Sequence, residues 1–285
     1  MRKLHAILLV TAAVAIFLVP SAGAVQFGEP DNGAHPWVGL VVFYDSTDTP
    51  FLRCSGSLIS ATTFLTAGHC AGGEVGSPRP ARARIWFDDG PIPADPAYRG
   101  GSCSVGGPYT GWPCAGEDAV GTPIAHPAWN GTFTIPQTSD VGIVRITSAP
   151  LPGPYGVVAP VGTLDGLDKK RGQHDVSFTL VAYGLQLLKP EQVSIRQRFT
   201  GTLRLVNLGN AATAGWNVEL TDNPGVGNGG SGGACRGDSG GPVLYELDGR
   251  EVIVAVDSFG SKNCKGVSYA YRVDTVYAQS FIASA

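Results

Sequence analysis

A chain of 285 residues is long enough to bury a hydrophobic core without depending on disulfide bonds. Its formal net charge is −3 and charged residues make up only 15% of it, with no basic run among them. These values exclude nucleic acid as an expected partner.

The first 24 residues have the three parts of a secretory signal. Arg2 and Lys3 precede an apolar run, and the segment ends in Ala22-Gly23-Ala24. The run is too short to span a bilayer, so an uncleaved membrane anchor is the weaker alternative. We expect a signal peptide over 1–24, cleaved after Ala24, and a secreted extracellular protein with no membrane partner.

Six cysteines in an exported chain indicate disulfide bonds, and six allow fifteen pairings. The chain has no C-x-x-C pair, which makes a zinc ribbon or a redox motif unexpected. A lone Glu74 is a weak calcium site, so we expect no metal and no cofactor. The simplest pairing joins sequence neighbours, which gives Cys54–Cys70, Cys103–Cys114 and Cys235–Cys264.

Short β-type runs, separated by glycine and proline, account for most of the chain. They lie at 37–44, 84–87, 141–146, 176–183, 202–208 and 252–256. Many short strands with turn residues between them indicate an all-β sandwich or barrel. A proline-rich stretch at 149–154 separates two halves, 25–150 and 151–285, and we expect one β-barrel in each.

Helical spacing occurs only near the C-terminus. There Val276, Tyr277, Phe281 and Ile282 fall near the i, i+4 pattern, and Asp274 precedes them as the expected cap. A short terminal helix follows from this spacing.

The stretch CRGDSGGPV, residues 235–243, is a turn rich in glycine. Ordinary turn chemistry explains such a composition, but the turn also presents the hydroxyl of Ser239. A serine becomes a nucleophile when a base takes its proton, and imidazole suits that task near neutral pH. Every histidine precedes Ser239, which excludes an α/β-hydrolase, where the histidine follows the serine.

His69 is the best candidate for the base. It follows a strand-like segment in LTAGHC, and the adjacent Cys70 can hold its turn in place. His35, His126 and His174 lie in polar or proline-containing segments and are interpreted as loop residues.

The third partner is expected to be Asp140, which opens the apolar strand 141–144. An aspartate carried against the core needs a partner, and a carboxylate beside the imidazole fixes its tautomer.

The motifs LTAGHC, SDVGIV and CRGDSGGPV, in this order, resemble the trypsin/chymotrypsin family of secreted serine peptidases (S1-type). The resemblance implies two packed six-stranded antiparallel Greek-key β-barrels with a short C-terminal helix. It implies an endopeptidase that hydrolyses peptide bonds through an acyl-enzyme, with His69 as base, Asp140 as orienting acid and Ser239 as nucleophile. Backbone N–H groups of Gly237 and Ser239 would form the oxyanion hole.

The resemblance also carries expectations about partners and processing. Protein or peptide substrates, protein inhibitors and a monomeric state are implied, and the disulfide pairing of sequence neighbours is supported. Cys103 and Cys114 then clamp an insertion at 88–117. The ammonium of Val25, freed by signal cleavage, is expected to pair with Asp238.

Substrate specificity departs from the trypsin pattern. The acid expected six residues before the nucleophile is replaced by Gly233, followed by Ala234. With Ser258, Phe259 and Gly260 as the opposing wall, we expect a neutral pocket. Asp257, next to Ser258, would offer a charge if it faced inward, but a surface position is the favoured interpretation. A binding protein on the same fold and an esterase without peptidase activity are the two alternatives.

Overall fold

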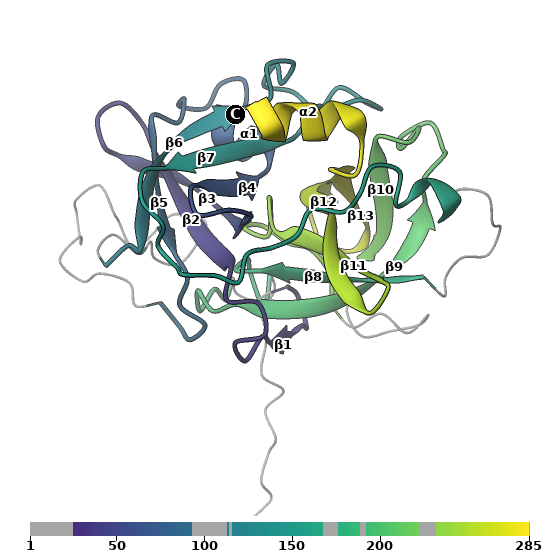
Figure 1. The fold of residues 1–285 in the computed structure, drawn as a ribbon, viewed down its shortest axis with the longest axis horizontal. Helices are drawn as coiled ribbons and strands as arrows, with labels where there is room; N and C mark the ends of the chain where they lie inside the picture. Colours follow the sequence, from purple (N-terminus) through teal and green to yellow (C-terminus); the bar gives the residue numbers. More distant parts are fainter. Residues whose placement is uncertain are drawn as a thin grey trace, which may run out of the picture.

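The computed structural model describes residues 25–92, 113, 116–167, 176–188, 192–222 and 232–284. Two six-stranded antiparallel β-barrels lie side by side in Figure 1, and the predicted fold class is confirmed. The predicted boundary at residues 150 and 151 falls between the last strand of the first barrel and the first strand of the second.

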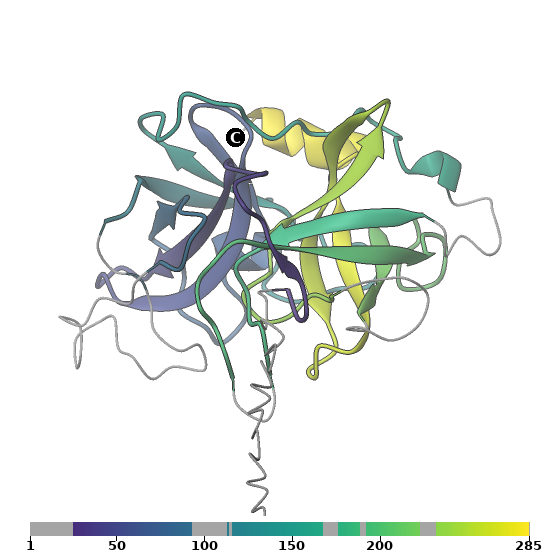
Figure 2. The same ribbon diagram turned by 90° about the horizontal axis from the view of Figure 1, so that it is seen from below.

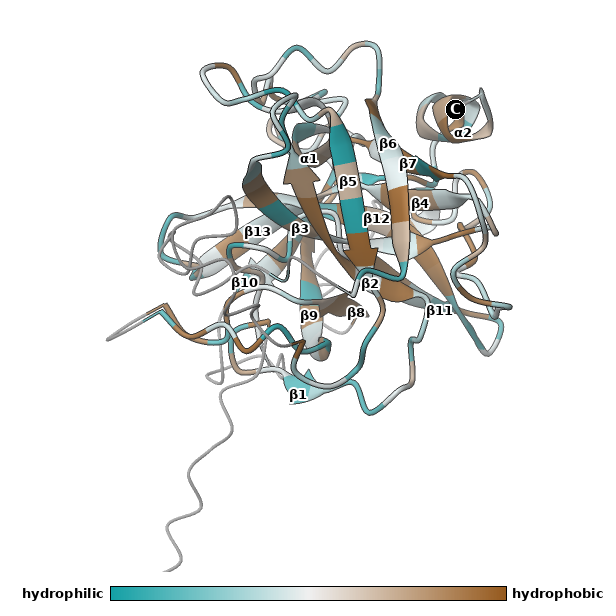
Figure 3. Cartoon of the chain, turned by 90° about the vertical axis from the view of Figure 1, so that its left-hand side faces the viewer, coloured by the Kyte–Doolittle hydropathy of each residue, from teal (hydrophilic) through white to brown (hydrophobic). Residues whose placement is uncertain are grey.

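The first barrel closes in the order β2-β3-β4-β7-β6-β5. Its strands are β2 (Val38–Tyr44), β3 (Pro50–Leu58), β4 (Thr63–Thr66), β5 (Arg82–Trp86), β6 (Ala119–Ala125) and β7 (Gly142–Ile146). Strand β5 returns to pair with β2, which makes the connection a Greek key. Every residue of β2 is buried, and this strand appears brown in Figure 3, whereas β5 alternates between polar and apolar residues.

The second barrel has the order β9-β10-β13-β12-β11-β8 and closes where β8 pairs with β9. Its strands are β8 (Ser177–Ala182), β9 (Phe199–Asn207), β10 (Asn217–Asp222), β11 (Pro242–Leu247), β12 (Arg250–Gly260) and β13 (Gly266–Arg272). Burial alternates along β9, as expected for a strand with one face toward the barrel interior.

The two ends of the described chain each join the opposite barrel. Strand β1 (Glu29–Pro30) pairs with β9 of the second barrel, where Figure 2 shows it as the purple segment. Helix α2 (Val276–Ser284) lies beside the first barrel, where the Tyr277 ring stacks on His126 with 4.4 Å between centroids. His126 follows β6 directly, as expected for a loop residue. Its packing against the Tyr277 ring was not expected from the sequence.

The predicted cap of α2 is wrong by one residue. The Ala278 N–H donates to Thr275 Oγ1 at 3.2 Å, so Thr275 caps the helix. The carboxylate of Asp274 instead accepts from Arg272 and from the Leu164 N–H. A buried guanidinium two residues away competes for the aspartate, and this contact is not visible in the helical spacing.

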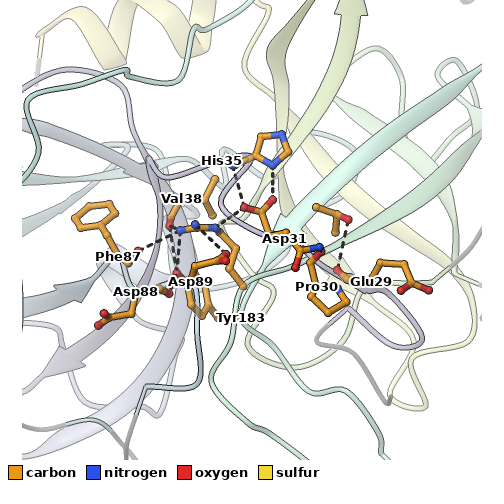
Figure 4. A network of polar contacts seen from close by, with 12 residues as sticks. Glu29, Pro30, Asp31, His35, Val38, Phe87, Asp88, Asp89 and Tyr183 are labelled. Carbon is orange, nitrogen blue, oxygen red and sulfur yellow. Dashed lines mark hydrogen bonds and ion pairs between the residues drawn. The ribbon is translucent and has the colours of Figure 1, made fainter. Parts of the chain in front are cut away.

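A buried arginine joins the two barrels (Figure 4). The Arg198 Nε lies 2.8 Å from Asp31 Oδ2, and its Nη1 donates to the Val38 carbonyl at 3.0 Å and the Phe87 carbonyl at 3.2 Å. The other face of Asp31 holds His35, whose Nε2 also lies 2.8 Å from Glu251 Oε2. His35 was expected as a loop residue; it is buried in this network, which fixes the position of one barrel against the other.

Candidate active site

His69 lies on α1 (Gly68–Gly72), a single helical turn that follows β4. Cys70 on the same turn is bonded to Cys54 on β3, so the turn is tied to the barrel wall. The helix is too short to be stable alone, and the disulfide together with the surrounding core holds it in place. These contacts fix the histidine at the edge of the first barrel.

Asp140 lies two residues before β7, is fully buried and contacts His69 through both carboxylate oxygens. Its Oδ1 accepts from the backbone N–H of His69 at 2.6 Å, and its Oδ2 lies 2.9 Å from His69 Nδ1. The Ser258 hydroxyl donates to the same Oδ2. The carboxylate thus holds the imidazole with Nδ1 as donor, which leaves Nε2 as an acceptor.

The environment raises the pKa of His69 above its usual 6.5. Burial lowers this pKa, but the charge of Asp140 and its hydrogen bond raise it by more, and the charge of Glu74 adds to them. A histidine whose pKa lies above 6.5 can act as a general base and as a general acid near neutral pH.

The turn that carries Ser239 joins the nucleophile candidate to the first barrel. The Ser55 N–H on β3 donates to the Ser239 carbonyl at 2.8 Å, and the Ser55 hydroxyl donates to the Gly237 carbonyl at 2.9 Å. The same hydroxyl accepts from the Tyr183 N–H at 2.9 Å. The sequence does not indicate this role of Ser55, because nothing near Cys54 points to a contact across the barrels.

Two backbone N–H groups of this turn are free to bind a ligand. Gly237 has φ +94°, a conformation that favours glycine. Neither its N–H nor that of Ser239 donates to an acceptor among the described residues. These are the two groups expected to form the oxyanion hole.

His69 and Ser239 line the same pocket, which has a volume of about 460 Å³. Four of the five residues predicted to bind substrate also line it: Ala234, Ser258, Phe259 and Gly260. Gly233 is not part of this lining. It pairs instead with Gln26, whose N–H donates to the Gly233 carbonyl at 2.9 Å.

Asp238 and Val25 are both buried, as the predicted ion pair requires. The Asp238 carboxylate accepts from the Gly184 N–H at 2.7 Å and the Cys235 N–H at 2.8 Å. Burial nevertheless raises the pKa of Asp238 to about 7. The pairing of a free Val25 ammonium with Asp238 stays a prediction.

Two of the three predicted disulfides are confirmed. Cys54 is bonded to Cys70, and Cys235 is bonded to Cys264, which connects the nucleophile turn to the rim of the pocket. The third predicted pair lies outside the described residues: Cys103 and Cys114.

The expected surface position of Asp257 is wrong. Asp257 is 5% exposed and lines the pocket that contains Ser239. A second acid, Asp222, is 1% exposed, and both of its carboxylate oxygens lack a hydrogen-bond partner among the described residues. Asp222 lies against Gly233, where any side chain would collide with its Oδ1.

The structure has two antiparallel barrels, a histidine paired with a buried aspartate, and a serine that lines the same pocket as the histidine. This combination defines the class of trypsin-like serine proteases. The sequence profile of the trypsin family matches residues 25–89 and 118–282. The chain therefore belongs to the trypsin family, a family of serine endopeptidases.

Individual proteins similar to this chain agree with that assignment. The CLIP domain-containing serine protease B15 of Anopheles gambiae is 27% identical over 256 residues, and the phenoloxidase-activating enzyme of Bombyx mori is 25% identical over 257 residues. Each alignment covers 86% of this chain but only 66% and 56%, respectively, of the relative. This chain thus spans less than two thirds of their length.

A solved structure, the HL collagenase at 1.7 Å resolution, shares the fold. It has a TM-score of 0.55 at 16% identity, and the superposition covers 88% of this chain and 94% of the collagenase chain. No helix in the described part of the chain reaches the length and hydropathy that a membrane crossing requires.

Proposed function

We propose that this protein is a secreted serine endopeptidase that hydrolyses peptide bonds through an acyl-enzyme. One observation carries the proposal: His69, which is paired with the buried Asp140, lines the same pocket as Ser239. In this proposal Ser239 is the nucleophile, His69 the base and acid, and Asp140 the orienting carboxylate.

The reaction proceeds in two half-reactions. His69 Nε2 takes the proton of the Ser239 hydroxyl while Oγ attacks the carbonyl carbon of the scissile bond. The oxygen of the tetrahedral intermediate receives hydrogen bonds from the N–H groups of Gly237 and Ser239. His69 then protonates the leaving amine, and a water molecule, activated by the same imidazole, hydrolyses the ester on Ser239.

Asp140 acts through His69. Because its carboxylate accepts from both the imidazole Nδ1 and the backbone N–H of residue 69, the ring is fixed in orientation and tautomer. The negative charge of the carboxylate also stabilises the imidazolium that forms during the attack.

The proposed enzyme is secreted and acquires its active N-terminus by signal cleavage. The signal peptide directs export, and its cleavage after Ala24 frees Val25, whose ammonium enters beside the buried Asp238 carboxylate. The enzyme then acts as a monomer on protein or peptide substrates and is restrained by protein inhibitors.

Labelling with a fluorophosphonate tests the nucleophile. The purified secreted protein is treated with the probe, digested, and the tagged peptide identified by mass spectrometry. We expect the label on Ser239, its loss in Ser239→Ala and in His69→Ala, and normal labelling in Ser261→Ala, a matched change at the exposed rim of the same pocket.

Absence of label on Ser239 would contradict the proposal. Folded protein with Val25 at its N-terminus and no label on Ser239 would reject the enzyme and favour a binding protein on the same fold. Label on Ser239 with hydrolysis of small esters but not of casein would restrict the activity to esters.

A further inference from the structure

The pocket beside Ser239 contains an acid that the trypsin pattern at position 233 does not supply. Asp257 on β12 lines this pocket, and its backbone is held by the nucleophile turn. The Asp257 N–H donates to the Gly241 carbonyl at 2.9 Å, and the Gly240 N–H donates to the Asp257 carbonyl at 2.7 Å. The acid is therefore fixed next to the residues that follow the nucleophile.

Burial and the neighbouring acids raise the pKa of Asp257 well above its usual 3.8. Asp222, Asp238 and Asp140 are close enough to interact electrostatically with it, and no described cation forms an ion pair with Asp257 or Asp222. Burying a carboxylate without a cation is unfavourable, and a cation that enters the pocket offsets this cost.

A second, independent group faces the same space. Ser268 on β13 is 1% exposed and lines the pocket, and its hydroxyl has no hydrogen-bond partner among the described residues. Ser268 pairs with Gly260 across the sheet, which places it in the wall that continues from Asp257. A hydroxyl can accept a hydrogen bond from a cationic N–H group.

The absence of a side chain at Gly233 leaves room for the Asp222 carboxylate beside the pocket. The Asp222 carboxylate occupies the space next to Gly233 that a side chain at this position would need. An acid from β10 thus lies behind the position at which trypsin-type enzymes carry their acid. It places a second buried acid near the pocket without itself lining it.

Exposed charged residues of both signs also line the pocket. Arg236 and Lys262 line its edge together with Glu74, and all three are exposed. Exposed charges are screened by water and salt, whereas the buried Asp257 is not. A buried acid in the pocket therefore affects the choice of bound side chain more than these exposed groups do.

We propose that this pocket binds the cationic side chain of an arginine or lysine on the amino side of the bond that is cleaved, with Asp257 as its ionic partner and the Ser268 hydroxyl as a second hydrogen-bonding group. Asp222 reinforces the charge from behind Gly233. The inference rests on the proposed function and names its substrate class; it replaces the neutral pocket expected from the sequence.

Binding of a small cation tests the pocket without catalysis. Benzamidine and its neutral analogue benzamide are titrated into Ser239→Ala protein by calorimetry. We expect benzamidine to bind and benzamide to bind about 10- to 100-fold more weakly, the ratio that a hydrogen-bonded charge gives. Adding Asp257→Asn removes this preference, whereas Glu246→Gln, at an exposed acid on β11, leaves it unchanged.

Cleavage of peptide anilides tests the same claim on the native protein. The panel carries Arg, Lys, Gln, Phe or Ala before the scissile bond. Preference for Arg and Lys is expected, with a loss of about 10- to 100-fold for Arg but not for Ala in Asp257→Asn. Preference for Phe or Ala would overturn the inference and leave the proposed function intact.

The two proposals fail in different ways. If no peptide is cleaved and Ser239 takes no label, but benzamidine binds and loses its affinity in Asp257→Asn, the proposed function fails and the cationic pocket stands. If Asp257→Asn does not fold, the native panel and the benzamidine-to-benzamide ratio still decide the inference.

Discussion

The hydroxyl of Ser258 donates to Asp140 Oδ2, the same carboxylate oxygen that lies 2.9 Å from His69 Nδ1. Ser258 belongs to β12 of the second barrel, whereas His69 and Asp140 belong to the first. The orienting acid is therefore held from both barrels at once. Any change in how the barrels pack alters the position of this carboxylate.

Replacing Ser258 by alanine is expected to weaken catalysis modestly. Asp140 loses one of its donors, so kcat/KM falls by about tenfold, and a more basic carboxylate raises the pKa of His69. The acid limb of the pH profile of kcat/KM then moves to higher pH. Ser258→Thr keeps a donor and is expected to retain the native profile; an unchanged profile in Ser258→Ala would contradict this role.

Activity is expected to fall in acid as His69 becomes protonated. Because its pKa is raised above 6.5, kcat/KM decreases as the pH falls through a value higher than that of free histidine. Asp140→Asn is expected to reduce kcat by roughly 10⁴-fold, because it favours the wrong tautomer. Asp248→Asn makes the same chemical change at an exposed turn and serves as the control.

Asp222 is expected to make stability depend on pH. Burial raises its pKa from the usual 3.8 to about 7, so the folded state binds this proton more tightly than the unfolded state. The free energy of unfolding therefore decreases as the pH rises from about 4 to about 7. At 1.36 kcal/mol per pKa unit the loss is on the order of 4 kcal/mol.

Urea unfolding of Asp222→Asn measures this effect. The variant is expected to gain stability over the native protein at pH 7.5 and to show no such gain near pH 4. Glu246→Gln is the matched change at an exposed acid. A difference between Asp222→Asn and native protein that does not vary with pH would exclude titration of this carboxyl as the cause.

Arg198 is expected to hold the two barrels together. Arg198→Met leaves Asp31 buried with one cationic partner fewer and removes one donor from each of the Val38 and Phe87 carbonyls. Removing one member of a buried pair costs roughly 3–5 kcal/mol, which urea unfolding detects. Arg250→Met changes an exposed arginine in the same way and is expected to cost much less; equal losses would argue against a role specific to Arg198.

The barrels were predictable because their strands are short, apolar and separated by turn residues, and the motifs around His69, Asp140 and Ser239 indicated the chemistry. The roles of Ser55 and Asp222 were not predictable, since both depend on contacts between segments far apart in the sequence. Asp257 was misplaced for a related reason. In a strand whose two faces are both buried, alternation does not distinguish a pocket wall from a surface position.

Each end of the described chain packs on the opposite barrel, so the two barrels are expected to stay together even if the chain between them is cut. A nick in the segment between β7 and β8 would yield two fragments, each of which retains an end seated on the other: β1 in the second barrel and α2 on the first. Arg198 would add its contacts across the same boundary. The fragments would therefore stay associated as a noncovalent pair, and their separation would require denaturation rather than dilution.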